Sequence, residues 1–251
     1  MAEIIALSII QGITEFLPVS SSAHLIIVGK YFNSSNQNLT LDISLHLGSL
    51  LAIIFYFKKD LSDFINSKIL FLKIIISSIP VIIFGVFLIQ FDLINLLRSY
   101  KIIGWSTVIF GVLLYFSDLV KVKKKFNKDF KYNSAIYVGL FQVLSLIPGV
   151  SRSGITITAA RFLNFGRTDA AKISFLISIP ALAVISLYNL QNLLINKNVE
   201  ISMFNFLGIF LSFVFSYITI KYFLKFLKKF SLLSFVIYRI ILGSFILIYA
   251  Y

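Results

Sequence analysis

The chain has 251 residues, of which 59% are hydrophobic and 13% charged, and its mean hydropathy is +0.94. This composition excludes an ordinary soluble domain and is typical of a polytopic membrane protein. The absence of cysteine excludes disulfides, thiolate metal sites and cysteine nucleophiles. The net charge of +13 does not indicate nucleic-acid binding, because the lysines lie between apolar segments rather than in a basic domain. We expect no cleavable signal peptide, because Glu3 stands where such a signal carries positive charge.

The first segment, residues 1–30, is apolar but is interrupted at Pro18. Proline has no backbone N–H and biases the preceding residue away from helix, so we expect one helix to end near Leu17. Serine is a favoured first cap, so a second helix should begin in the serine cluster at residues 20–22. Neither half reaches the roughly 20 residues of a membrane span. We therefore predict a re-entrant helix–loop–helix hairpin, with ordinary spans as the alternative.

Three full spans are predicted after this hairpin, followed by a basic loop at about 119–133. The spans are predicted at residues 42–58, 69–90 and 100–118. Residues 134–163 then repeat the first device, because they break at Pro148-Gly149 and continue into a second serine cluster. We expect a helix end near Ile147 and a second re-entrant hairpin there. Three further spans are predicted at residues 170–191, 203–222 and 233–250.

The element order predicts one all-α polytopic membrane domain with an inverted-topology repeat. Each repeat, at about 1–118 and 134–251, is one hairpin followed by three crossings. Because three is odd, the second repeat starts from the opposite side of the membrane. The two hairpins should then point at each other across the midplane.

The distribution of basic residues agrees with this crossing count. The N-terminal side receives only Lys30, Arg98, Lys101 and Lys197. The other side receives Lys58, Lys59, Lys68, Lys73, Lys121, Lys123, Lys124, Lys125, Lys128, Lys131, Arg167, Lys172, Lys221, Lys225, Lys228 and Lys229. By the positive-inside rule the lysine-rich side is cytoplasmic, and both termini face outward.

The two loops carry the polar residues that are costly in a membrane and therefore indicate function. A helix N-terminus offers free N–H groups and a positive dipole end, and two such ends are predicted to meet. With the planar donor fork of Arg152, they favour a phosphate or pyrophosphate over a carboxylate. Glu15 and His24 bracket the first loop and suit acid–base work on a nearby serine.

Structural explanations of the same residues stay open from the sequence alone. Gln11 and Glu15 are spaced for a hydrogen bond along one helix face. His24 could be a buried histidine whose hydrogen bonds are satisfied, and the serines could be caps only.

Other polar residues give weaker signals. Asp42 and His46 open a span, where a cap with a polar neighbour competes with a role in the site. Arg161 and Arg167 suit lipid-phosphate contacts or interfacial anchors, whereas Arg239 lies inside a span with a partner that the sequence does not reveal.

The stretch QGITEFLPVSSSAH at residues 11–24 resembles the Glu/Gln-rich motif of bacterial undecaprenyl-diphosphatases, the bacitracin-resistance family. PGVSRSGIT at residues 148–156 is similar to the second signature of that family, PGxSRSxxT. Further similarity runs through residues 45–51, 174–180 and 238–243, so the resemblance covers essentially the whole chain.

The resemblance implies a phosphatase that converts undecaprenyl diphosphate to undecaprenyl phosphate and so recycles the carrier lipid of peptidoglycan synthesis. It implies catalytic residues Glu15, Ser21, His24 and Arg152. It implies phosphate-binding residues Gln11, Ser20, Ser22, Ser151, Ser153 and Thr156.

The resemblance also implies a divalent cation, Mg²⁺ or Ca²⁺, and a site that opens outward. Gln11 departs from the glutamate of the motif, so the cation would depend on Glu15, hydroxyls, water and the pyrophosphate itself. The expected partners are the polyprenyl diphosphate lipid and the bilayer, with no nucleic acid and with a homodimer as an open assembly state.

Two questions stay open at this point. The nucleophile is Ser21, His24 or a water molecule activated by Glu15. A lipid or anion transporter is the main rival function, because inverted repeats with broken helices are also a transporter design. A membrane scaffold is a weaker rival, since it would not need Arg152 at depth.

Overall fold

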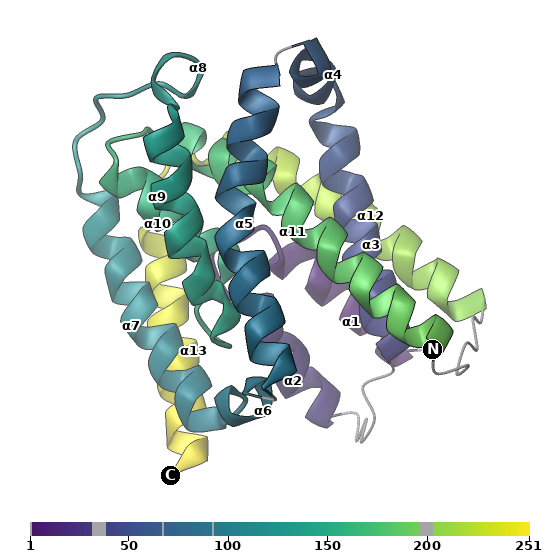
Figure 1. Cartoon of the computed structure of the whole chain (residues 1–251). Coiled ribbons are helices and arrows are strands. Elements are labelled where there is room, and N and C mark those ends of the chain that lie inside the picture. Colours follow the sequence, from purple (N-terminus) through teal and green to yellow (C-terminus); the bar gives the residue numbers. More distant parts are fainter. Residues whose placement is uncertain (1, 32–38, 67, 92, 196–202) are drawn as a thin grey trace.

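The computed structural model describes residues 2–31, 39–66, 68–91, 93–195 and 203–251 (Figure 1). Within these ranges the regular structure is helical, with no β-strand and one isolated bridge between Lys124 and Phe165. The elements are α1 (Ala2–Thr14), α2 (Ser21–Tyr31), α3 (Leu39–Tyr56), α4 (Lys58–Asn66), α5 (Lys68–Gln90), α6 (Ile94–Leu97), α7 (Tyr100–Asp118), α8 (Phe126–Asp129), α9 (Tyr132–Val143), the 3₁₀ turn η1 (Leu144–Leu146), α10 (Arg152–Phe162), α11 (Arg167–Ile195), α12 (Met203–Phe226) and α13 (Leu233–Ala250).

The predicted multi-pass membrane architecture is confirmed. Five helices are long and apolar enough to cross a membrane: α5, α7, α11, α12 and α13. The sixth predicted span corresponds to α3, a shorter apolar helix. It ends at Tyr56, two residues before the predicted end, and the charged stretch from Lys58 forms the separate helix α4.

Both predicted helix breaks occur. α1 ends at Thr14, three residues earlier than predicted, and the chain turns through residues 15–19 before α2 begins at Ser21. In the second segment α9 and η1 end at Leu146, and α10 begins at Arg152.

The residue before the second helix of each segment has an unusual backbone conformation. Ser20 and Ser151 have φ values of 74° and 67°, a left-handed region that a non-glycine residue rarely adopts. Such conformations cost about 1–3 kcal/mol and persist only where the surrounding structure holds them.

The tips of the two helix pairs lie in the middle of the molecule. In Figure 1, α9 and α10 reach the middle from the end where α4 and α8 lie, and α2 runs from the middle toward the end near α6. Both chain termini lie away from α4 and α8. α1 packs against α12 and α9 packs against α5, while α3 contacts α12 and α7 contacts α13.

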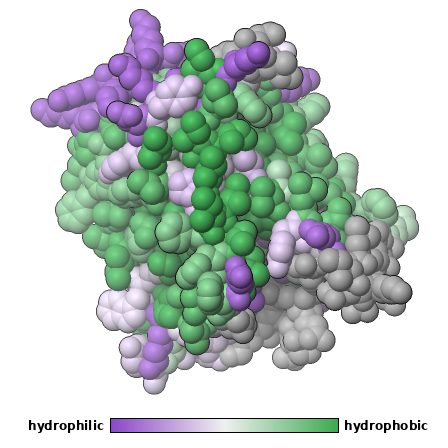
Figure 2. All heavy atoms as spheres, in the orientation of Figure 1, coloured by the Kyte–Doolittle hydropathy of each residue, from purple (hydrophilic) through white to green (hydrophobic). Residues whose placement is uncertain are grey.

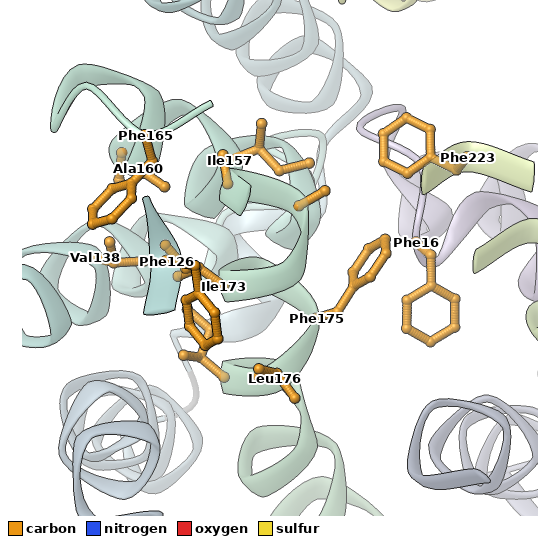
Figure 3. Close-up of a cluster of buried hydrophobic side chains, with 14 of the residues drawn as sticks. Phe16, Phe126, Val138, Ile157, Ala160, Phe165, Ile173, Phe175, Leu176 and Phe223 are labelled. Carbon is orange, nitrogen blue, oxygen red and sulfur yellow. The ribbon is translucent and has the colours of Figure 1, made fainter. Parts of the chain in front are cut away.

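Aromatic side chains fix the first tip in the core (Figure 3). Phe16, in the turn after α1, is 1% exposed and meets Phe175 of α11 edge to face, with ring centroids 5.3 Å apart. Phe175 also contacts Phe223 of α12, at 6.1 Å between centroids. Burying Phe16 therefore holds the turn that carries Glu15 against α11.

The outer surface matches a lipid environment. Large apolar side chains such as Phe84, Phe87 and Phe245 are exposed on the long helices. Figure 2 shows hydrophobic residues over the middle of this face and hydrophilic residues gathered at the end where α4 and α8 lie. Apolar surface on this scale is stable in hydrocarbon rather than in water.

Candidate active site

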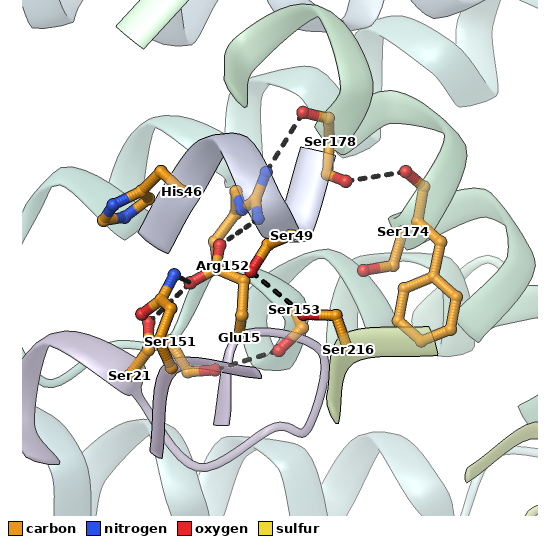
Figure 4. Close-up of polar contacts among 12 residues, drawn as sticks. Glu15, Ser21, His46, Ser49, Ser151, Arg152, Ser153, Ser174, Ser178 and Ser216 are labelled. Atoms are coloured by element: carbon orange, nitrogen blue, oxygen red, sulfur yellow. Dashed lines mark hydrogen bonds and ion pairs between the residues drawn. The ribbon is translucent and has the colours of Figure 1, made fainter. Parts of the chain in front are cut away.

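The carboxylate of Glu15 lies at the meeting point of the two loops (Figure 4). It forms an ion pair with Arg152, which begins α10. Its other oxygen accepts hydrogen bonds from Gln11 Nε2 at 3.0 Å and from Ser21 Oγ at 2.8 Å. Arg152 also donates to the carbonyl oxygen of Ser178 at 3.1 Å. The fold therefore brings together three of the four predicted catalytic residues.

Direct hydrogen bonds join the two loops to each other. Ser153 Oγ donates to the carbonyl oxygen of Leu17 at 2.7 Å. Ser151 Oγ accepts from the backbone N–H of Gly154 at 3.1 Å, so Ser151 is the helix cap that the sequence predicted. Ser106 of α7 donates to the carbonyl oxygen of Pro148 at 2.6 Å. These bonds hold the start of α10, and with it Arg152, next to the first loop.

Arg239 of α13 holds both loops through their carbonyl oxygens. The residue is completely buried, and its partners could not be predicted from the sequence. Its nitrogens donate to the carbonyl oxygens of Val150 at 2.9 Å, Gly149 at 3.0 Å, Thr107 at 3.2 Å and Pro18 at 3.3 Å. A buried cation needs such a full set of acceptors, because desolvation is costly.

A cavity of about 340 Å³ opens beside the Glu15–Arg152 pair. Predicted site residues that line it are Glu15, Ser20, Ser21, Ser22, Ser151 and Arg152. Apolar residues that line it are Leu25, Ile26, Val81, Leu146, Pro148, Ala181, Leu182 and Ile185. The cavity thus combines a cation, an acid and several hydroxyls with an apolar wall.

Three further predicted residues do not line the cavity but hydrogen-bond the lining residues or the loops that carry them. Gln11 is fully buried and donates to Glu15, and Ser153 holds the first loop. Thr156 Oγ1 donates to the Arg152 carbonyl oxygen at 2.8 Å and lies 2.7 Å from Ser174 Oγ, whose hydroxyl can donate to it. These residues position the loops rather than line the cavity.

His24 does not line this cavity. Its Nδ1 is 2.7 Å from the carbonyl oxygen of Ser20, and its Nε2 is 2.5 Å from the hydroxyl of Tyr238 on α13. The two rings stack with centroids 5.7 Å apart. Since a carbonyl oxygen only accepts, Nδ1 carries the proton and Nε2 accepts from Tyr238. Both ring nitrogens are therefore occupied by the protein.

Sequence reasoning missed two polar lining residues, Arg98 and Ser145, and could not place two others. Asp42 and His46 of α3 line the cavity, as does Arg98, which precedes α7. The sequence placed Arg98 in a loop on the N-terminal side and left Asp42 and His46 undecided. Asp42 and His46 could have been predicted if the side of α3 that faces the loops were known. Hydropathy alone does not reveal that side, because α3 is apolar on every side.

A family model described as Bacitracin resistance protein BacA matches residues 4–245. The chain belongs to the BacA family. Similar proteins include undecaprenyl-diphosphatases of Pelagibacter ubique strain HTCC1062 and of Saccharophagus degradans. The first is 51% identical over 250 residues, which cover 99% of this chain and 97% of the relative. The second is 42% identical, over 95% of this chain and 94% of the relative.

Two other arginines of this BacA-family chain lie in a separate cluster at the end of α7. Arg167 donates to both oxygens of Asp118, at 2.6 and 3.0 Å. Arg161 donates to the carbonyl oxygens of Asp118, Val120 and Phe165. Both arginines therefore brace the turns around α7 and α10.

A divalent cation fits this BacA-family site only if most of its ligands come from outside the protein. Within the described residues, no three His, Asp or Glu side chains form a group that could hold a metal. Both oxygens of Glu15 already accept from Arg152, Ser21 or Gln11. Mg²⁺ prefers oxygen ligands and keeps several waters, so phosphate oxygens and water would have to supply most of its ligands.

Proposed function

We propose that this BacA-family chain is an undecaprenyl-diphosphatase that hydrolyses undecaprenyl diphosphate to undecaprenyl phosphate and inorganic phosphate. The observation that carries the proposal is the contact of Ser21 and Arg152 with Glu15 in the lining of one cavity. A nucleophile, its proton acceptor and a phosphate-binding cation are the groups that phosphoryl transfer requires. The relatives that share nearly the full length carry the name of this activity.

The pyrophosphate would be held by Arg152 and by the ends of two helices. α2 begins at Ser21 and α10 at Arg152, and both helix N-termini lie beside the cavity. Free N–H groups and the helix dipole there favour an anion. The apolar residues of the lining, among them Leu25 and Leu182, would contact the first units of the lipid chain.

In the first step Ser21 attacks the terminal phosphorus. Its Oγ–P bond forms, the bridging P–O bond breaks, and the lipid phosphate leaves with the electron pair. The Ser21 proton passes along the existing 2.8 Å hydrogen bond to Glu15. Arg152 turns from Glu15 to the phosphoryl oxygens and balances their charge in the transition state. Hydrolysis of the phosphoserine completes the cycle.

A divalent cation remains part of the proposal. It would enter with the pyrophosphate and would be held by phosphate oxygens, water and Glu15, with Ser20 or Ser22 nearby. When bound it would neutralise phosphate charge. The steps of Ser21 and Glu15 do not depend on which cation is used.

The inverted-topology repeat is proposed with support from matching details in the two halves. The same number of residues separates Gln11 from Gln142 and Ser20 from Ser151, and both glutamines are fully buried. Both serines have positive φ. Each lies 3.2 Å from the hydroxyl of the serine two residues later, Ser22 or Ser153. α1 packs on α12 as α9 packs on α5.

The membrane orientation is proposed from the charges. The lysine-rich end with α4 and α8 would be cytoplasmic, and both termini and the cavity would face outward. Arg98 and Asp42, which line the cavity, belong to the end opposite the lysines. Lys197, which the sequence placed on the outer side, lies outside the described residues. The homodimer stays a prediction.

The test is release of inorganic phosphate from a polyprenyl diphosphate by the purified protein in detergent, with and without chelator. Wild-type protein should release phosphate, and Glu15→Ala and Arg152→Ala should not. Absence of phosphate release with every divalent cation tested would refute the proposal and favour lipid transport. The names of the relatives describe a phosphatase rather than a transporter.

A further inference from the structure

His46 lies on α3 and lines the cavity, and one of its ring nitrogens has no hydrogen-bond partner among the described residues. Its Nδ1 lies 2.8 Å from the carbonyl oxygen of Asp42, one turn earlier on the same helix. A carbonyl oxygen only accepts, so Nδ1 must carry a proton. In the neutral ring Nε2 then holds a lone pair, and it has no hydrogen-bond partner within the described ranges. The backbone of α3 therefore fixes the tautomer of a base.

The chain has only two histidines, and they differ in their hydrogen bonds and in their position relative to the cavity. His24 uses both ring nitrogens on Ser20 and Tyr238 and does not line the cavity. His46 lines the cavity together with Glu15 and Ser21. Figure 4 shows the His46 ring projecting from its helix on the side of Glu15 and Ser21.

The proposed reaction needs a second proton acceptor besides Glu15. After the first step Glu15 holds the proton of Ser21, and in the second step it must return that proton to the departing Ser21 oxygen. One carboxyl group cannot donate that proton and accept another from water in the same step. Gln11, which donates a hydrogen bond to Glu15, is an amide and cannot accept a proton at neutral pH.

We infer that His46 is the base that activates the water which hydrolyses the phosphoserine, an inference that rests on the proposed function. The water oxygen bonds to phosphorus, the Ser21 Oγ–P bond breaks, and the water proton moves to His46 Nε2. Ser21 recovers its proton from Glu15, inorganic phosphate leaves, and His46 then loses its proton to solvent.

The surroundings favour His46 over Asp42 as the base that accepts the water proton. Asp42 is also there, but a carboxylate would be repelled by the phosphoryl group, whereas a neutral imidazole would not. Besides the carboxyl groups of Asp42 and Glu15, the charged groups in the lining are Arg98, which precedes α7, and Arg152 at the start of α10. α11 contributes only apolar residues to this lining: Ala181, Leu182 and Ile185.

The experiment uses polyprenyl diphosphate labelled in its terminal phosphate and purified full-length protein in detergent. Lipid phosphate, free phosphate and protein-bound phosphate are measured after rapid quenching. His46→Gln keeps a donor for the Asp42 carbonyl but no base. It should form lipid phosphate in a burst, accumulate phosphate on Ser21, and release inorganic phosphate about 10²- to 10⁴-fold more slowly than wild type. Imidazole added to His46→Ala should restore phosphate release, which a variant that is merely misfolded would not show.

Two matched variants make the result specific. His24→Gln and Asp42→Asn should not accumulate phosphoprotein, whatever their overall rate. The inference is overturned if His46→Gln releases phosphate at the wild-type rate, if it loses both steps equally without phosphoprotein, or if Asp42→Asn is the variant that accumulates it. Wild-type protein without phosphatase activity would instead refute the proposed function and this inference with it.

Discussion

Arg152 and Glu15 form an ion pair between the two loops, although 137 positions separate them in the sequence. Each neutralises the other in a buried place, where an unpaired charge would be costly. A phosphate that binds Arg152 must therefore compete with Glu15. When it succeeds, Glu15 keeps its hydrogen bond from Ser21 and is free to accept that proton. In the proposed mechanism, the pair therefore links binding of the phosphate to activation of Ser21.

Replacing Arg152 with lysine should weaken phosphate recognition while keeping the charge. Lysine lacks the planar fork that can hold Glu15 or a phosphate together with the Ser178 carbonyl oxygen. We expect kcat/KM for phosphate release to fall about 10- to 100-fold, the value of a charge-assisted hydrogen bond. Steady-state kinetics in detergent measure it. Wild-type kinetics in Arg152→Lys would show that charge alone suffices.

Removing the Ser21 hydroxyl should abolish the first step. We expect Ser21→Ala to lower phosphate release at least about 10³-fold, as loss of a nucleophile does. Ser22→Ala is the matched control. Its hydroxyl lies 3.2 Å from that of Ser20 and makes no contact with Glu15, so its loss should lower the rate less than about tenfold. Near-full activity in Ser21→Ala, with loss of activity in His24→Ala, would refute the serine mechanism.

Replacing Arg239 with methionine should destabilise the protein and reduce its activity. The change leaves buried carbonyl oxygens in both loops without donors, among them those of Pro18 and Val150. We expect a loss of about 2–5 kcal/mol, only partly offset by removal of a buried charge. The thermal midpoint in detergent reports it.

The control for Arg239 is Lys225→Met, which removes an exposed cation near the end of α12. It should change stability by less than about 0.5 kcal/mol. An Arg239→Met protein with the midpoint and activity of wild type would show that the loops hold their shape without the guanidinium.

Adding one methyl group at Gly149 should disturb the second loop. Gly149 has φ +95°, which L-residues avoid, and a Cβ there would collide with Ser106 Oγ and the Ile103 carbonyl oxygen. We expect Gly149→Ala to cost about 1–3 kcal/mol from the backbone conformation alone, seen as a lower thermal midpoint. Gly166→Ala is the control, since its Cβ would lie at an ordinary 3.7 Å from Val122. Equal midpoints for the two variants would contradict the expectation.

Local chemistry in the sequence was sufficient for the helices and the breaks. Hydropathy located the spans because a membrane helix must be apolar along its whole length. Pro18 and Pro148 mark the breaks because each is followed by a serine cluster that can cap a new helix, whereas Pro80 and Pro180 lie inside α5 and α11. The sequence analysis did not predict α4, because this helix is too short and too charged to be recognised as a membrane span.

The candidate site was predicted only in part, because its assembly depends on helix rotation. The motifs identified Glu15, Ser21 and Arg152, which do meet. They did not indicate which histidine faces the cavity, since a helix that is apolar on every side has no face that hydropathy can identify.

By itself, the sequence determined the long apolar helices, the two broken segments and the residue types that a phosphate site needs. Only the tertiary structure decided that His24 turns to Tyr238, that His46 faces the loops, and that Arg239 binds carbonyl oxygens of both. Hydropathy and helix stops are properties of neighbouring residues. Contacts between helices depend on how side chains far apart in the chain pack together, and no short stretch of sequence encodes that.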